Sequence, residues 1–217
     1  MRQGLAGLWL ILLMVGGSGP RAGATAAVPS PTTPPSGSER YVVVPAESRA
    51  VYRAEEVFFG PNNRFHVAVG MTNAVRGELW IDRSDPRRSR IGAITVDIST
   101  LKSDANERDR MIRTQWLESS RFPMAQFTPT AITGLPDAYV PGQELFVQIV
   151  GDLRVREVTR PVTFATTLKL DGAALTGVAT TRILMTDFGF SPPSLLGILK
   201  AQNQVTIEFD FTARAAG

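Results

Sequence analysis

The chain has 217 residues, a size suited to one domain or at most two small ones, and its 43% hydrophobic and 20% charged residues are typical of a globular protein. It contains no cysteine and one histidine, which excludes disulfides, thiolate zinc sites, cysteine nucleophiles and metal sites that need two imidazoles. The net charge of +3 falls to about +1 without Arg2 and Arg21, so the charge gives no reason to expect nucleic acid as a partner.

Residues 1–26 have the three parts of a secretory signal peptide. Arg2 gives a positive start, an apolar stretch of about eleven residues runs from Leu5 to Val15, and Ala24-Thr25-Ala26 forms an A-x-A cleavage site. A membrane-spanning helix needs roughly twenty apolar residues, so a retained amino-terminal anchor is the less favoured alternative. We therefore expect an exported protein with no stable membrane span after cleavage, either secreted or located in the periplasm or cell envelope.

A short tether and a single domain follow the signal peptide. Residues 27–40 are rich in Pro, Ser and Thr and have almost no apolar bulk, which predicts an extended, disordered linker. The folded domain is expected over residues 41–215, a length that can bury a sizeable core.

Most of this domain alternates between apolar and polar residues with a period of two, which predicts β-strands with one dry and one wet face. The clearest strand is predicted over Glu144–Arg156. The apolar positions that alternate in the other runs are Phe65, Val67 and Val69; Val75, Leu79 and Ile81; Ile94, Val96 and Ile98; Val162, Phe164, Leu168 and Leu170; and Val205, Ile207, Phe209 and Phe211. Turn signals such as Asp171-Gly172 separate the runs, so the pattern predicts an antiparallel sheet, most simply closed into a barrel that leaves no long edges.

One segment has helical character instead. Residues Asn106–Ser120 contain good helix formers and no Gly or Pro, and either Asp104 or Asn106 is expected to cap the start. The helix should end before Phe122-Pro123, because a residue that precedes proline is pushed out of helical geometry. A single short helix is therefore predicted within the all-β domain, either plugging one end of the barrel or covering an edge.

Catalytic machinery is not indicated. His66 is the only ordinary imidazole base, it is expected on the polar face of its strand, and no Gly-x-Ser-x-Gly motif is present. Asp109, Asp152 and Asp187 stand where turn or cap chemistry explains an aspartate. Arg108, Arg110 and Arg113 are interpreted as a solvated helix face paired with Glu107, Asp109 and Glu118. The alternative places Arg108 at a barrel mouth, facing an anionic head group.

Four sequence pieces together resemble the YceI-like family of exported, lipocalin-like barrel proteins. They are VDISTLKS at Val96–Ser103, Arg108-Asp109 with the following LESSRFP at Leu117–Pro123, VGDLRVREVTRPV at Val150–Val162, and TDFG at Thr186–Gly189. The third piece is the most specific. The chain departs from the family in lacking its early and later histidines and in having Glu157 where a glycine often precedes Val-Thr.

The resemblance implies an all-β, antiparallel lipocalin-like β-barrel whose apolar pore holds a polyisoprenoid or similar long-chain amphiphile for transport, storage or sequestration. It implies binding without turnover, so we predict no enzyme activity. We also predict no cofactor and no metal, and we leave a homodimer open. We predict that the ligand is contacted by Leu145, Val147, Ile149, Phe164, Leu168, Phe209 and Phe211, with Arg108 near the mouth. Two alternatives remain open: a structural or interaction domain of the cell envelope with a filled barrel, and a hydrolase or isomerase that acts on such lipids.

Overall fold

The computed structural model describes residues 37–195 and 197–216. The predicted signal peptide and residues 27–36 of the predicted tether lie outside the described residues. Within the described residues, no helix is long and apolar enough to cross a membrane. The first strand begins at Glu39, so the folded domain starts two residues before the expected boundary at Tyr41.

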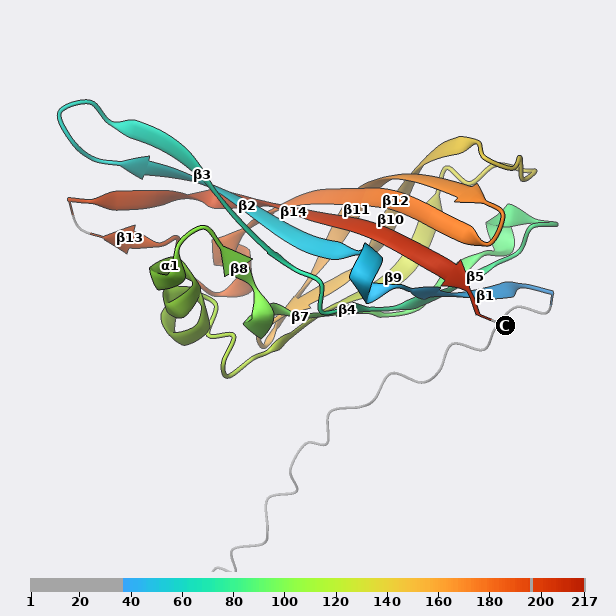
Figure 1. The fold of residues 1–217 in the computed structure, drawn as a ribbon, viewed down its shortest axis with the longest axis horizontal. Coiled ribbons are helices and arrows are strands. Elements are labelled where there is room, and N and C mark those ends of the chain that lie inside the picture. Colours follow the sequence, from blue (N-terminus) through green and yellow to red (C-terminus); the bar gives the residue numbers. More distant parts are fainter. Residues whose placement is uncertain (1–36, 196, 217) are drawn as a thin grey trace, which may run out of the picture. The chain divides into compact units, whose positions relative to one another are not determined.

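The described chain is mostly β-strand, with one short α-helix (Figure 1). The strands are β1 (Glu39–Val43), β2 (Arg49–Phe58), β3 (Arg64–Thr72), β4 (Val75–Arg76), β5 (Glu78–Ile81), β6 (Arg90–Ile91), β7 (Ile94–Asp97), β8 (Lys102–Ser103), β9 (Met124–Thr133), β10 (Glu144–Val155), β11 (Val158–Asp171), β12 (Ala174–Leu184), β13 (Ser194–Leu195) and β14 (Leu199–Ala215). The helices are α1 (Asn106–Met111), which continues as a π-helix over Ile112–Trp116, and the 3-10 turns Pro45–Glu47, Pro86–Arg88, Ile98–Thr100 and Met185–Phe188.

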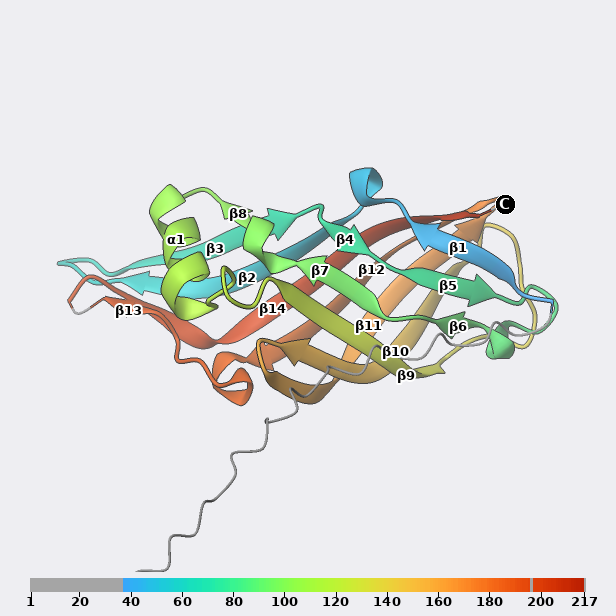
Figure 2. The ribbon, with the colours of Figure 1, turned by 90° about the horizontal axis from the view of Figure 1, so that it is seen from below.

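The strand pairing runs round a closed antiparallel barrel. Neighbours pair in the order β7-β9-β10-β11-β12-β14, and β14 then pairs with both β1 and β2. β1 pairs with β5, and β5 is separated from β4 only by Gly77. Since β4 pairs with β7, the ring closes on the strand from which it started. The predicted antiparallel lipocalin-like barrel is confirmed, and Figure 2 shows its strands from a second direction.

Burial follows the predicted alternation in the carboxyl-terminal half of the barrel. In β10, Val147, Ile149, Leu153 and Val155 are buried while the residues between them are half-buried or exposed, apart from Gly151. Asp171-Gly172 forms the predicted turn between β11 and β12, and Gly172 has a φ of 56°, a left-handed conformation that glycine adopts without steric cost. These long strands place one continuous apolar face toward the interior.

The two faces of β3 are the reverse of the prediction. Phe65 is 83% exposed and Val67 is also exposed, whereas Ala68 and Gly70 are buried. His66 lies opposite Glu56 of β2, a buried residue, so the histidine shares the inward face instead of the predicted polar outer face. The alternation in β3 is confirmed, but its inner face carries the small residues Ala68 and Gly70. Apolar character therefore does not show which of the two faces points inward.

The predicted helix is shorter than expected and is capped differently. Helical structure ends at Trp116 instead of Ser120, because Glu118 takes a left-handed conformation with a φ of 50° that turns the chain out of the helix. The amino-terminal cap is Ala105, which makes no side-chain capping bond, so the predicted caps Asp104 and Asn106 were wrong.

Candidate functional site

An apolar cavity of about 310 Å³ runs inside the barrel. This volume falls within the range of roughly 300–1,000 Å³ that is usual for small-molecule sites. Almost all of its wall is formed by aliphatic and aromatic side chains from strands all round the barrel. Asp82, Arg83 and Ser89 lie at the end near β5 and β6, and Glu56 and Arg108 lie at the end near α1. The barrel interior is therefore hollow, and the alternative of a completely filled barrel does not hold.

All seven apolar side chains predicted to contact a ligand lie on the wall of this cavity. Leu145 and Ile149 of β10 are paired with Leu168 and Phe164 of β11 in the strand register, which places the four on one inner surface. Phe209 and Phe211 of β14 are stacked, with ring centroids 5.4 Å apart. The structure brings together residues from three strands, while their contact with a ligand remains a prediction.

The sequence reasoning missed the contribution of β9. Phe127 and Ile132 of this strand line the cavity, and the Phe127 ring meets Phe164 edge to face with centroids 4.9 Å apart. Pro129 lies inside β9, and the register with β10 shifts opposite it, between Val150 and Gly151. A proline within an alternating run of residues argues against a β-strand there. The remaining sequence evidence for β9 is the alternation of Phe127 with its neighbours.

Arg108 lies at the cavity wall but is already bound to protein partners. Its guanidinium donates to Glu56 Oε2 at 3.1 Å and also binds Asp104, and the Arg108 side chain is 11% exposed. Burial lowers the pKa of Arg108, but hydrogen bonding and charge attraction from Glu56 and Asp104 together outweigh burial and raise the pKa above its ordinary value. The hydrogen bond from Arg108 lowers the pKa of Asp104. Arg108 is therefore not part of the predicted solvated helix face, and a role for it near a ligand head group remains a prediction.

The other members of the arginine cluster divide between confirmed and corrected pairings. Arg110 pairs with Glu107, as the solvated-face interpretation predicted. Asp109 is buried and accepts hydrogen bonds from the Ser103 backbone N–H at 2.9 Å and the Ser103 hydroxyl at 2.7 Å, so it serves neither as an arginine partner nor as a helix cap. Glu118 pairs with Arg156 and Arg121 instead of with the helix arginines.

Tyr52 lies on the cavity wall beside this charged cluster. Burial raises the pKa of Tyr52 to about 12, against the opposing effect of the positive charge of Arg108. Its hydroxyl is buried and, among the described residues, makes no hydrogen bond of normal geometry. The ring fits there because position 70 is a glycine: a Cβ on Gly70 would stand 2.2 Å from the Tyr52 ring.

His66 is an unremarkable member of the inner face of β3. Its Nε2 is 3.8 Å from Asp104 Oδ2, its ring meets Phe58 at a centroid distance of 6.2 Å, and its side chain is 40% exposed. Asp152 and Asp187 are exposed. Within the described ranges, no group of three or more acidic or histidine side chains has the geometry to hold a metal ion.

The fold and the cavity define a class of closed antiparallel barrels with an apolar interior. The family model of the YceI-like domain matches residues 41–213, so the chain belongs to the YceI-like family. A UPF0312 protein of Pseudomonas putida (strain GB-1) is 30% identical over 124 residues, which are 54% of this chain and 60% of that protein. One from Vibrio vulnificus (strain YJ016) is 28% identical over 126 residues, 55% of this chain and 62% of the relative. The chain thus spans about three fifths of the curated relatives it matches.

Solved structures share the fold at low sequence identity. Burkholderia cenocepacia BcnA matches with a TM-score of 0.60 and 17% identity, over 78% of this chain and 98% of BcnA. A polyisoprenoid binding domain from Saccharophagus degradans, implicated in plant cell wall breakdown, matches with a TM-score of 0.58 and 10% identity, over 82% of this chain and 99% of that domain. These similarities agree with the observed barrel.

Proposed function

We propose that this protein binds a single polyisoprenoid or similar long-chain amphiphile in the barrel cavity and carries, stores or sequesters it without chemical conversion. The observation that carries the proposal is the cavity of about 310 Å³ with an almost wholly apolar wall. Each methylene group moved from water into such a cavity gains about 0.8 kcal/mol, so a long hydrocarbon chain can bind with no charged anchor. The Saccharophagus degradans domain of the same fold, described as polyisoprenoid binding, supports this ligand class.

The proposal includes export of the protein. Residues 1–26 would act as a signal peptide and residues 27–38 as a tether, leaving the barrel in the periplasm, the cell envelope or the medium. Binding outside the cytoplasm suits a carrier of a water-insoluble chain, because such a chain needs an apolar enclosure to cross an aqueous compartment.

Extraction of the purified protein with organic solvent, followed by mass spectrometry and by uptake of an added prenol, tests the proposal. Leu168→Gln places an amide on the cavity wall, and Lys169→Gln places the same group on the outward-facing neighbour. An amide that loses water without gaining a partner costs about 1–3 kcal/mol, so Leu168→Gln is expected to weaken uptake roughly tenfold, whereas Lys169→Gln leaves it unchanged. Repeated absence of both bound amphiphile and prenol uptake in the unsubstituted protein would contradict the proposal.

A further inference from the structure

The barrel carries a second apolar surface, on the outside of one end. The β2–β3 and β13–β14 hairpins extend together beyond α1 (Figures 1 and 2). In the strand register, Phe65, Val57 and Lys200 lie in one row across the three strands β3, β2 and β14. Beyond the Phe58–Leu199 pair, Phe59 and Ile198 lie nearer the tip and are joined by a hydrogen bond of 2.9 Å from the Phe59 N–H to the Ile198 carbonyl. We call Phe59, Phe65, Val67 and Ile198 the tip face.

The four apolar side chains of the tip face are largely exposed to solvent, which is unusual for apolar residues. Phe65 is 83% exposed, Ile198 59%, and Phe59 and Val67 are each 47% exposed. Single apolar residues on a surface need no explanation, but several that are contiguous on one sheet face indicate an interaction site. Because these side chains point outward, they are separate from the inward residues that line the cavity.

The charge around the tip face is positive. Residues 57–65 and 197–200 include Arg64 and Lys200 and no acidic residue. Lys200 lies in the same row as Phe65, on the tip face, whereas Arg64 pairs with Phe58 and lies on the opposite face of the hairpin. Neither basic side chain makes an ion pair within the described part of the chain, although Arg64 lies over the Phe58 ring at 5.8 Å. The first acidic side chain on this face is Glu55, which stands opposite Val67 and further from the tip. An apolar hairpin end with one basic side chain on each of its faces matches an anionic lipid surface, where the rings enter the acyl boundary and the charges meet the head groups.

The tip face is also continuous with one end of the cavity. Glu56 and Ala201 are each adjacent in sequence to a residue of the Val57–Lys200 row, and both line the cavity from the inner face of the same strands. A surface that rests on the tip face would therefore lie next to this end of the cavity.

We propose that the tip face docks the protein onto an anionic phospholipid bilayer. This inference goes beyond ligand binding and does not rest on it, since docking uses side chains at the hairpin ends that do not line the cavity. A second copy of the chain is the main competing occupant, because β3 pairs with β8 only at Gly70 and Met71 and leaves an edge free from Arg64 to Val69. A two-fold pair through this face would bring Lys200 near its own copy, so like charges oppose that arrangement.

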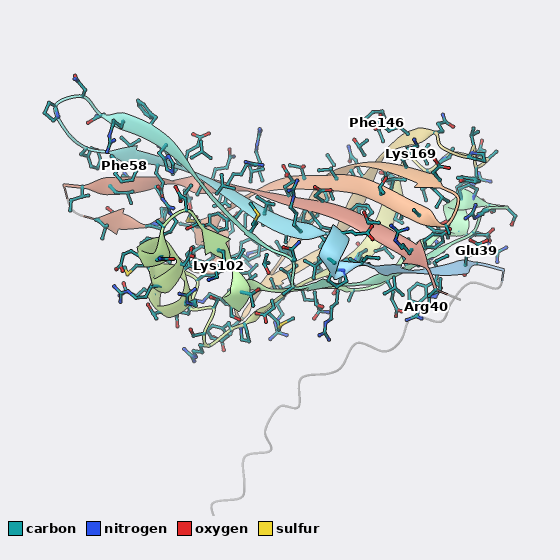
Figure 3. All side chains as sticks on the ribbon, in the orientation of Figure 1. Glu39, Arg40, Phe58, Lys102, Phe146 and Lys169 are labelled. Carbon is teal, nitrogen blue, oxygen red and sulfur yellow. The ribbon has the colours of Figure 1, made fainter. Side chains whose placement is uncertain are left out.

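Sedimentation with vesicles tests the proposal. The full chain is mixed with vesicles of phosphatidylcholine and phosphatidylglycerol in a 70:30 ratio, and with vesicles of phosphatidylcholine alone. The variant Phe59→Ser/Phe65→Ser removes the aromatic rings, and Phe146→Ser is its matched control. Phe146 is 72% exposed and lies far from the tip, as its position relative to Phe58 in Figure 3 shows. All substituted side chains are exposed, and circular dichroism checks that each variant is folded.

We expect binding to the mixed vesicles, a loss of at least tenfold in partitioning for Phe59→Ser/Phe65→Ser, and no change for Phe146→Ser. A basic residue near an anionic surface contributes about 1 kcal/mol, so Arg64→Gln/Lys200→Gln is expected to lower partitioning on mixed vesicles roughly 30-fold. No binding, or equal losses for the tip and control variants, would overturn the proposal. A concentration-dependent dimer in sedimentation velocity that Phe59→Ser/Phe65→Ser abolishes, without vesicle binding, would assign the tip face to self-association instead.

Discussion

The Nη2 atom of Arg108 lies 3.1 Å from the Oε2 atom of Glu56, and both side chains are largely withdrawn from solvent. Arg108 comes from α1 and Glu56 from β2, so the pair ties the single helix to the barrel wall. In an otherwise apolar interior, the Glu56 carboxylate depends on Arg108 for compensation, while Arg108 also binds Asp104.

We predict that Arg108→Met lowers the free energy of unfolding by about 3 kcal/mol, because it leaves the Glu56 carboxylate buried without its partner. The measurement is urea unfolding followed by circular dichroism. Arg110→Met is the matched control: it lies on the same helix, and its ion pair with Glu107 is exposed, so little change is expected. The double variant Arg108→Met/Glu56→Gln should recover part of the loss. Equal stability of Arg108→Met and the unsubstituted protein would show that the pair does not hold the helix.

Removal of the hydroxyl group should affect the stability of the protein differently at Tyr52 and at Tyr41. The Tyr52 hydroxyl is buried without a hydrogen bond of normal geometry, so Tyr52→Phe is expected to leave stability unchanged or raise it by up to about 1 kcal/mol. The Tyr41 hydroxyl accepts from Arg83 and donates to Glu39, so Tyr41→Phe should cost about 1 kcal/mol. Thermal unfolding of the two variants makes the comparison, and a larger loss for Tyr52→Phe would contradict it.

The pH dependence of Tyr52 gives a second measurement on the same variant. Burial raises its pKa from 10.0 to about 12, so the folded protein holds this proton more tightly than the unfolded chain. The corresponding contribution to stability is complete below pH 10 and is lost as the pH rises toward 12. In alkaline titration monitored by phenolate absorbance, the step near pH 12 should disappear in Tyr52→Phe.

The sequence predicted the barrel well where strands are long and their inner faces are large and apolar. Leu145, Val147 and Ile149 alternate without interruption, and burial of one face requires this register. The ion pair between Arg108 and Glu56 was not predictable, because the two residues are 52 positions apart in the chain and no sequence motif links them. The faces of β3 were misassigned for a different reason: Ala68 points inward and Phe65 outward, so side-chain size was a misleading guide.

Asp82 provides a test at acidic pH. Its Oδ1 atom accepts hydrogen bonds from the Ser84 hydroxyl at 2.6 Å and from the backbone N–H groups of Ser84 and Asp85, each at 3.0 Å. The hydrogen bond from the Ser84 hydroxyl is the main cause that lowers the pKa of Asp82 below its ordinary value of 3.8. The stabilisation by the carboxylate is therefore present above about pH 4 and is lost as the pH falls through the lowered pKa.

Asp82→Asn is thus predicted to be less stable than the unsubstituted protein at pH 7, with the difference shrinking progressively below pH 4. Urea unfolding across this pH range measures the difference. Asp152→Asn is the control, since Asp152 is exposed on the outer face of β10. A difference for Asp82→Asn that stays constant with pH would mean that its charge is not involved.

Filling part of the hollow interior tests whether the ligand occupies it. Ala179 of β12 is buried, lines the cavity and lies opposite Phe209 of β14, so Ala179→Phe would direct a ring into the open space. Since the cavity offers about 310 Å³, we expect a stability cost below the 1–3 kcal/mol that is typical of overpacking a filled core. Prenol uptake should fall strongly, because the added ring occupies volume that an alkyl chain would use. Val178→Phe is the matched control, since Val178 is 41% exposed on the outer face of the same strand and should leave uptake unchanged. Full uptake by Ala179→Phe would place the ligand outside this part of the barrel.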